Sequence, residues 1–141
     1  MPRARSILLA VGLGTAAPLT AVPATAASTD AASSNAANYD EALRCAAIDS
    51  IVLGAMRPAD ETAASPADRA SAKALEDRAV SWLMLAVNLN SADEAATKVD
   101  FGAAINALSD AIAQAPDSAA LEQIISPGLQ HCVQRESELF G

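Results

Sequence analysis

Apolar residues recur along most of this chain with the period of an α-helix and not that of a strand. Between residues 38 and 56 one apolar position follows another every three or four residues, which is wide enough to face a core. This stripe consists of Cys45, Ile48, Val52 and Met56. Asn38 can cap the free amides before it, and the residue preceding Pro58 is pushed out of the helical region. We therefore expect a first helix over 38–56.

A second helix is predicted over 66–89. Ser65 is a suitable N-cap and Pro66 occupies the first helical position, where its missing amide costs nothing. Asp68 lies in the first turn, where the helix dipole favours a negative charge. The apolar stripe that follows includes Trp82, which we expect to anchor the core.

A third helix is predicted from Ser91, whose spacing to Glu94 is that of a capping box, to about Ala115. Gly102 inside it indicates either a close helix contact or a boundary between two helices. Asp117 can cap a fourth helix, which Pro127 should break. Because the connections are short, the predicted fold class is all-α, a four-helix antiparallel up-down bundle.

The first 26 residues have the pattern of a secretory signal peptide. Arg3 and Arg5 precede an apolar run over 7–19, which is shorter than a membrane span and ends in small residues. Ala26 is the expected last residue removed, and cleavage one position later, after Ala27, is the alternative. We expect a periplasmic or secreted protein without a stable membrane anchor, divided into signal 1–26, flexible leader 27–37 and a single helical domain over 38–141.

Charge and composition limit the classes of partner. Removal of Arg3 and Arg5 changes the formal charge of −8 to −10. An acidic surface repels phosphate backbones and anionic lipids, so we expect no nucleic-acid partner. Alanine supplies much of the 52% hydrophobic content, whereas aromatic residues make up 3%, so the core should be thin.

The two cysteines, Cys45 and Cys132, meet an oxidising compartment if the protein is exported. Such a pair most often forms a structural bridge, and we predict an intramolecular disulfide between the first and last helices. In the chain-entropy treatment, a loop of this length stabilises the fold by about 4.5 kcal/mol.

No residue pattern indicates catalysis, a metal or a cofactor. His131 and Cys132 are adjacent, so on a helix they point about 100° apart and cannot easily act as base and nucleophile. Cys45, Cys132 and His131 have the residue types of a zinc site but not its short spacings. Haem bound by Met56 and His131 is incompatible with the predicted disulfide, which would place the two about 16 Å apart. We therefore expect a non-enzymatic protein.

Residues 100–118 resemble the second helix of a tetratricopeptide repeat. Ala104, Leu108, Ala111 and Pro116 stand where that family has its small, bulky, small and proline residues. Residues 39–43 resemble the same helix more weakly, but the two segments are not separated by a multiple of the repeat length of about 34 residues. The resemblance implies a peptide-binding or scaffolding surface.

Two classes of function follow from these observations. The first is an interaction or adaptor module that offers a helical face or groove to an unknown protein partner. The second is a carrier with a small-molecule ligand held in a cavity between helices. A carrier should be purified with bound mass, whereas an adaptor should respond only to a partner.

Overall fold

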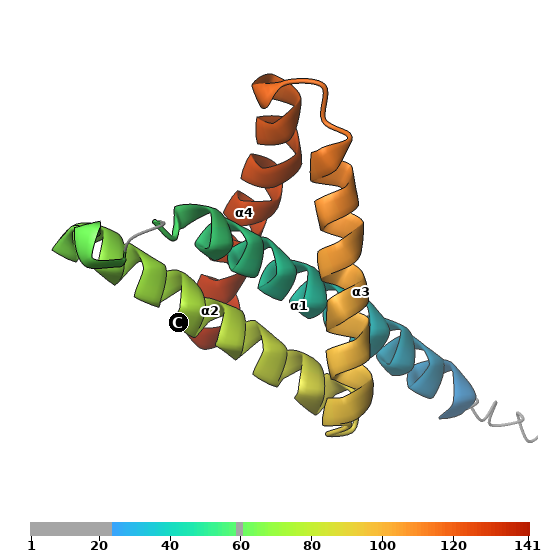
Figure 1. Ribbon diagram of the computed structural model, residues 1–141. Helices are drawn as coiled ribbons and strands as arrows, with labels where there is room; N and C mark the ends of the chain where they lie inside the picture. The colour runs from blue at the N-terminus through green and yellow to red at the C-terminus, as the bar shows by residue number, and fades with distance from the viewer. Residues whose placement is uncertain (1–23, 59–60) are drawn as a thin grey trace, which may run out of the picture.

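The computed structural model describes residues 24–58 and 61–141, and this part of the chain is helical and contains no strand (Figure 1). The elements are α1 (Ala24–Met56), a short 3-10 helix η1 (Glu61–Ala63), α2 (Pro66–Leu89), α3 (Glu94–Ala113) and α4 (Ser118–Phe140). The predicted class, an all-α up-down arrangement of four helices, is confirmed.

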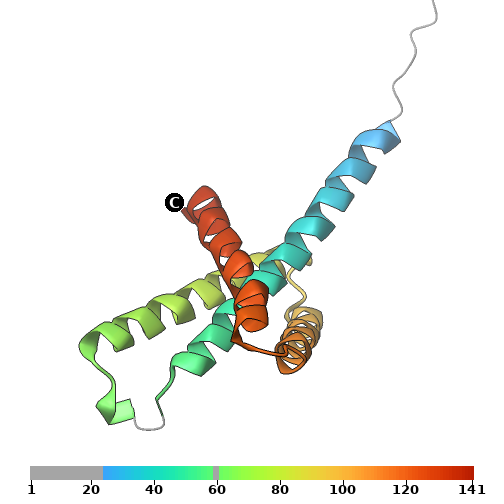
Figure 2. The same ribbon diagram turned by 90° about the horizontal axis from the view of Figure 1, so that it is seen from above.

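Helix α1 is the centre of the fold. It packs most extensively against α2 and also contacts α3 and α4. In Figure 1 the α1–α2 pair is crossed at a wide angle by α3 and α4, and Figure 2 shows that the first turns of α1 project away from the other helices. The half of α1 that follows residue 38 therefore carries the contacts that hold the fold together.

Polar caps start helices α2 and α4. Ser65 and Asp68 form a capping box at α2, in which the Asp68 amide donates to Ser65 Oγ at 3.1 Å and the Ser65 amide donates to Asp68 Oδ2 at 3.2 Å. Asp117 accepts from the Ala120 amide at 2.8 Å and caps α4. These start signals were predicted correctly.

The core is small and rich in alanine, and Trp82 is its largest buried side chain. Trp82 is 0% exposed, as predicted, and the ring of Phe140 packs edge-on against it with the centroids 5.5 Å apart. Around it lie several small or aliphatic residues: Ala42, Leu43, Ala46, Ile48 and Ala86. Few large side chains are buried, so each one contributes a large share of the hydrophobic stabilisation.

A buried ion pair crosses the α1–α2 interface. Asp49 is fully buried and Arg78 nearly so, and the guanidinium donates to both carboxylate oxygens, at 2.7 Å from Nε and 2.5 Å from Nη2. The geometry is bidentate, which fixes the register of the two helices as well as their separation. This pair was not predicted from the sequence.

The start of α1 differs from the prediction. The helix begins at Ala24 and not at Asn38, so the leader over 27–37, which was expected to be flexible, is helical. Alanine has the highest helix propensity, and residues added to an existing helix do not incur the cost of nucleation. The exposed stretch 33–37 shows that α1 extends here without core contacts.

The start of α3 also differs. The predicted N-cap was Ser91, but Ser91 and Ala92 have positive φ angles of 55° and 62°, and the cap is Asp93, which accepts from the Ala96 amide at 2.9 Å. Gly102 lies within the uninterrupted α3, and a Cβ placed there would meet nothing within 4 Å. It is therefore neither a helix boundary nor a close contact.

The predicted break at Pro127 is wrong, because α4 continues from Ser118 to Phe140 with Pro127 inside it. An interior proline costs about 3 kcal/mol, since it removes one hydrogen bond and crowds the preceding turn. Here Gly128 and Cys132 are buried against α1 just after the proline, while Pro127 itself is exposed. Packing on α1 offsets the local cost, as tertiary contacts commonly do.

Candidate functional site

The predicted disulfide joins α1 to α4. Cys45 and Cys132 are bonded, with sulfur atoms 2.06 Å and Cα atoms 5.5 Å apart, and each residue is 1% exposed. The other predicted site residues, Ala26 and Ala27, lie in the first turn of α1, and residues 1–23 of the signal predicted over 1–26 lie outside the described residues. Cleavage between these residues therefore stays a prediction.

A charged cluster flanks the disulfide. Glu41 Oε1 lies 2.5 Å from His131 Nε2, and Arg135 donates to both Glu41 oxygens at 3.2 to 3.4 Å. Arg135 also donates to Glu138 at 2.5 Å. The cluster therefore adds polar contacts to the covalent link between α1 and α4.

The pKa of Glu41 reflects two opposing effects. Burial raises it, but the hydrogen bonds from Arg135 and His131 outweigh burial and leave the pKa below the ordinary value of 4.5. Glu41 thus carries a negative charge that its partners stabilise. The sequence contained a signal for this cluster. In antiparallel helices joined at Cys45 and Cys132, the turn that precedes Cys45 lies beside the turn that follows Cys132, and these turns carry Glu41 and Arg135.

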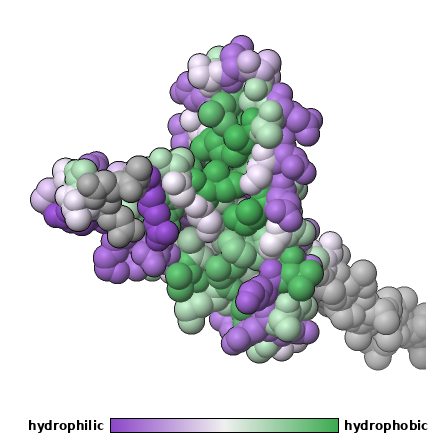
Figure 3. Space-filling model, viewed as in Figure 1, coloured by the Kyte–Doolittle hydropathy of each residue, from purple (hydrophilic) through white to green (hydrophobic). Residues whose placement is uncertain are grey.

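A groove of about 670 Å³ lies between α1, α3 and α4. Figure 3 shows hydrophobic residues gathered between the upper parts of α3 and α4, on the face seen in Figure 1. The apolar lining of the groove consists of Leu43, Ala47, Ile48, Ala103, Ala104, Ala107, Leu108, Ala111 and Ile124. Three of these on α3 are exposed, namely Ala103, Ala107 and Ala111, so the groove is open to solvent along that helix.

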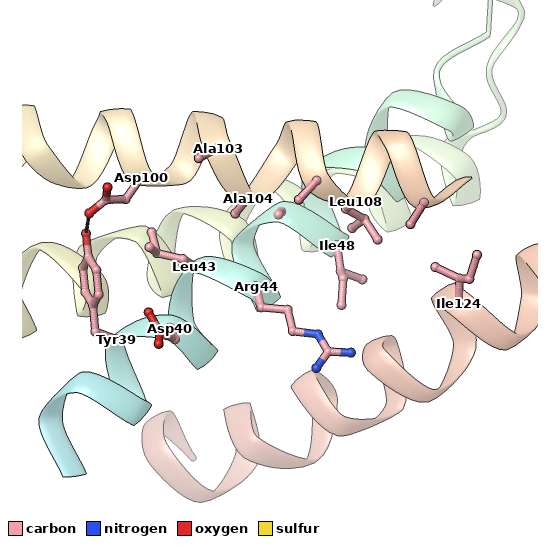
Figure 4. A pocket seen from close by; sticks show the side chains of 13 residues that line it. Tyr39, Asp40, Leu43, Arg44, Ile48, Asp100, Ala103, Ala104, Leu108 and Ile124 are labelled. Atoms are coloured by element: carbon pink, nitrogen blue, oxygen red, sulfur yellow. Dashed lines mark hydrogen bonds between the residues drawn. The ribbon is translucent and has the colours of Figure 1, made fainter. Parts of the chain in front are cut away.

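Polar side chains occupy one end of the groove. The Tyr39 hydroxyl donates to Asp100 Oδ2 at 2.7 Å, and Asp40 lies beside this pair (Figure 4). Burial and the hydrogen bond to Asp100 raise the pKa of Tyr39, so the phenol stays protonated and remains a donor. This end of the groove is therefore acidic.

Arg44 is the cation of the groove. It comes one turn after Asp40 on α1, and in Figure 4 its guanidinium extends toward α4 and away from the Asp40 carboxylate. Arg44 is exposed and forms no ion pair within the described part of the chain. It also lines a second cavity of about 500 Å³, which lies between α1 and α4 beside the disulfide.

The two segments that resemble tetratricopeptide helices both line this groove. Tyr39 and Leu43 come from one, and Ala104, Leu108 and Ala111 come from the other. The alanines among the lining residues let α1 and α3 approach each other and leave the space of the groove unfilled. The sequence pattern marks both segments but does not place them together, because α1 and α3 are separated by the whole of α2.

A chemical role for Cys132 would require a free thiol. The sulfur of Cys132 is bonded to Cys45, so it has no thiol to act as a nucleophile or a metal ligand. In the described ranges, 24–58 and 61–141, no three His, Cys, Asp or Glu side chains gather where they could hold a metal ion. Over the same ranges no helix combines the length and the apolar character that crossing a membrane requires.

Comparison with known proteins leaves the fold and the groove as the basis for any functional argument. No protein-family model matches the chain, and neither the curated proteins nor the solved structures that were searched gave a significant match.

Proposed function

We propose that the mature chain is an exported, non-enzymatic interaction module whose groove between α1, α3 and α4 holds a helix of another protein. The observation that supports this most is the groove itself, which is apolar along its floor, open on one side and framed by three helices. Apolar grooves of this kind bind amphipathic helices through side chains spaced one turn apart.

The length of the groove suits a short helix. The groove follows α3 from Asp100 to Ala111, a distance of roughly 16 Å at the rise of an α-helix. A partner helix of three turns covers that distance and presents anchors at positions i, i+4 and i+7. The exposed alanines of α3 permit a close approach of the partner backbone, because they carry no bulk to hold it away.

The alternative function is that of a carrier, which would hold a small ligand in the same groove. Its volume of about 670 Å³ lies within the range of small-molecule sites. Such sites usually bury most of their ligand, whereas Ala103, Ala107 and Ala111 leave this one exposed along the second half of α3. The openness therefore favours a macromolecular partner.

Export is part of the proposal. The disulfide is compatible with an extracellular protein, because such bonds persist in oxidising compartments. The predicted signal over 1–26 supports the same location. The intact mass of protein recovered from the periplasm tests both ideas: we expect a chain that begins at Ala27 and is two hydrogens lighter than its reduced form. An uncleaved chain with two free thiols would contradict the proposal.

Binding in the groove can be tested with a pair of matched variants. Ala107→Trp fills the groove, whereas Ala113→Trp places the same bulk on an exposed alanine of α3 that does not line it. The probes are leucine-faced amphipathic helical peptides, labelled for fluorescence anisotropy. We expect Ala107→Trp to weaken binding at least tenfold and Ala113→Trp to leave it unchanged.

Two outcomes of this experiment would overturn the proposal. One is that none of the peptides binds the wild-type protein. The other is that both tryptophan variants bind as the wild type does, which would place the peptide elsewhere. Bound lipid or metabolite that co-purifies with the native protein, and that Ala107→Trp excludes, would favour the carrier instead.

A further inference from the structure

The groove carries negative and positive side chains at separate positions. Their positions allow it to distinguish between partner helices by charge. At one end lie Asp40 and Asp100, and one turn further along α1 stands Arg44, whose guanidinium extends toward α4. The floor between and beyond them is apolar. A helix lying in this groove would therefore meet an acidic surface at one end and a cation nearer α4.

The charges of the groove are available to a partner. Arg44 has no ion-pair partner within the described residues, although the chain as a whole carries an excess of acidic side chains. Asp40 is exposed, and its carboxylate points away from the Arg44 guanidinium in Figure 4. Asp100 accepts from the Tyr39 hydroxyl, which holds it at the end of the groove without neutralising its charge. Each of the three can thus act on a bound helix.

We propose that the groove selects a partner helix with a basic side chain facing Asp40 and Asp100 and an acidic side chain facing Arg44. This inference rests on the proposed function, since it specifies the helix that the groove takes. The apolar face of that helix supplies the affinity. The two charges fix its direction and position, because a helix placed otherwise would put like charges together and leave Arg44 unpaired.

A double-mutant cycle between the protein and the peptide isolates the contact at Arg44. The probe is a leucine-faced helical peptide of about 16 residues, long enough to cover the groove, with lysine near one end and glutamate along the same edge. A second peptide replaces that glutamate with lysine. Both are measured by fluorescence anisotropy against the wild type and against Arg44→Glu, in the full mature protein.

Arg57→Glu is the control for long-range charge. Arg57 is exposed, lies beyond the end of α1 and does not line the groove, so its substitution changes the net charge equally without touching the site. We expect the wild type to prefer the peptide with one lysine and one glutamate. The preference is the ratio of the two dissociation constants. This ratio should shift toward the peptide with two lysines about tenfold more in Arg44→Glu than in Arg57→Glu.

The outcomes separate this inference from the proposed function. If Arg44→Glu and Arg57→Glu shift the preference equally while Ala107→Trp still blocks binding, the groove binds helices but Arg44 does not read their charge, and the inference is wrong. If no peptide binds the wild type, or if Ala107→Trp has no effect, the proposed function fails and this inference fails with it.

Discussion

At the residue scale, the two glycines that lie inside α3 and α4 have opposite surroundings. A Cβ built on Gly128 would lie 2.6 Å from Ile48 Cδ1, whereas one built on Gly102 would meet nothing within 4 Å. Ile48 is 1% exposed, so its side chain has little room to move away. Gly128 is therefore required by the contact between α4 and α1, while Gly102 only lowers the helix propensity of α3.

Alanine substitution should have opposite effects at these two glycines. Gly102→Ala should raise the free energy of unfolding by about 0.5 to 1 kcal/mol, because alanine favours the helix. Gly128→Ala makes the same local gain but overpacks the contact with Ile48, so we expect a net loss of about 1 kcal/mol. Urea denaturation measures both. In an Ile48→Val background, which removes Cδ1, Gly128→Ala should no longer destabilise the fold. A loss of stability that persists in this background would show that the contact with Ile48 is not the cause.

The ion pair between Asp49 and Arg78 leads to a second prediction. Asp49→Ala leaves a nearly buried guanidinium whose remaining acidic neighbour, Glu136, is 3.9 Å away and partly exposed. We expect a loss of about 3 kcal/mol in the free energy of unfolding. Replacing both partners with apolar residues, as in Asp49→Leu with Arg78→Met, should cost much less, because no buried charge is left alone. Equal losses in the single and double variants would contradict this account.

Glu41 gives the fold a pH dependence with a definite sign. Its folded-state pKa is lowered by Arg135 and His131, whose hydrogen bonds outweigh the opposing effect of burial. A lowered folded pKa means that the stabilisation is fully present above the ordinary value of 4.5 and is lost as the pH falls through the folded value.

We expect Glu41→Gln to unfold at a lower temperature than the wild type at pH 7, with the difference shrinking as the pH falls below 4.5. Thermal unfolding followed by circular dichroism at several pH values measures it. Glu122→Gln is the control, since Glu122 is an exposed glutamate at the other end of α4 and makes no ion pair within the described residues. A difference between Glu41→Gln and the wild type that does not change with pH would contradict the assignment.

At the element scale, the sequence predicted the features that depend on neighbouring residues and missed those that depend on distant ones. Ser65 and Asp117 were identified as caps because a cap is recognised within three residues. The continuity of α4 through Pro127 was missed because it depends on α1, which packs against Gly128. The groove was missed for the same reason, since its lining residues come from three helices.

Helix α4 depends on its links to α1 more than on broad packing, because it contacts α1 over a short stretch and α3 hardly at all. We therefore expect the double variant Cys45→Ser with Cys132→Ser to lose about 4.5 kcal/mol of stability in the chain-entropy treatment. Hydrogen exchange measured by mass spectrometry should show the largest loss of protection in α4. Uniform loss across all helices would mean that the bond stabilises the fold as a whole and does not chiefly retain α4.

At the scale of the whole molecule, the contacts divide α1 into two parts. The part from Tyr39 onward carries the core, the disulfide, the ion pairs and the groove, whereas residues 33–37 are exposed. Figure 2 shows the first turns of α1 projecting clear of the other helices. A helix of this kind is maintained by its alanine content and by continuity with the packed part, and tertiary contacts contribute little.

Shortening the projecting part should therefore leave the fold intact. We compare a mature chain that begins at Ala27 with one that begins at Ala36, by thermal unfolding and far-ultraviolet circular dichroism. The unfolding temperatures should agree within about 2 °C, because residues 33–35 are exposed and the turns before them project away from the other helices in Figure 2. The shorter chain should lose only the helical signal of the deleted turns and should bind the helical peptides as before, since the groove begins at Tyr39. A clearly lower unfolding temperature would show instead that these turns pack against the body, and that the helix beginning at Ala24 is held there by tertiary contacts.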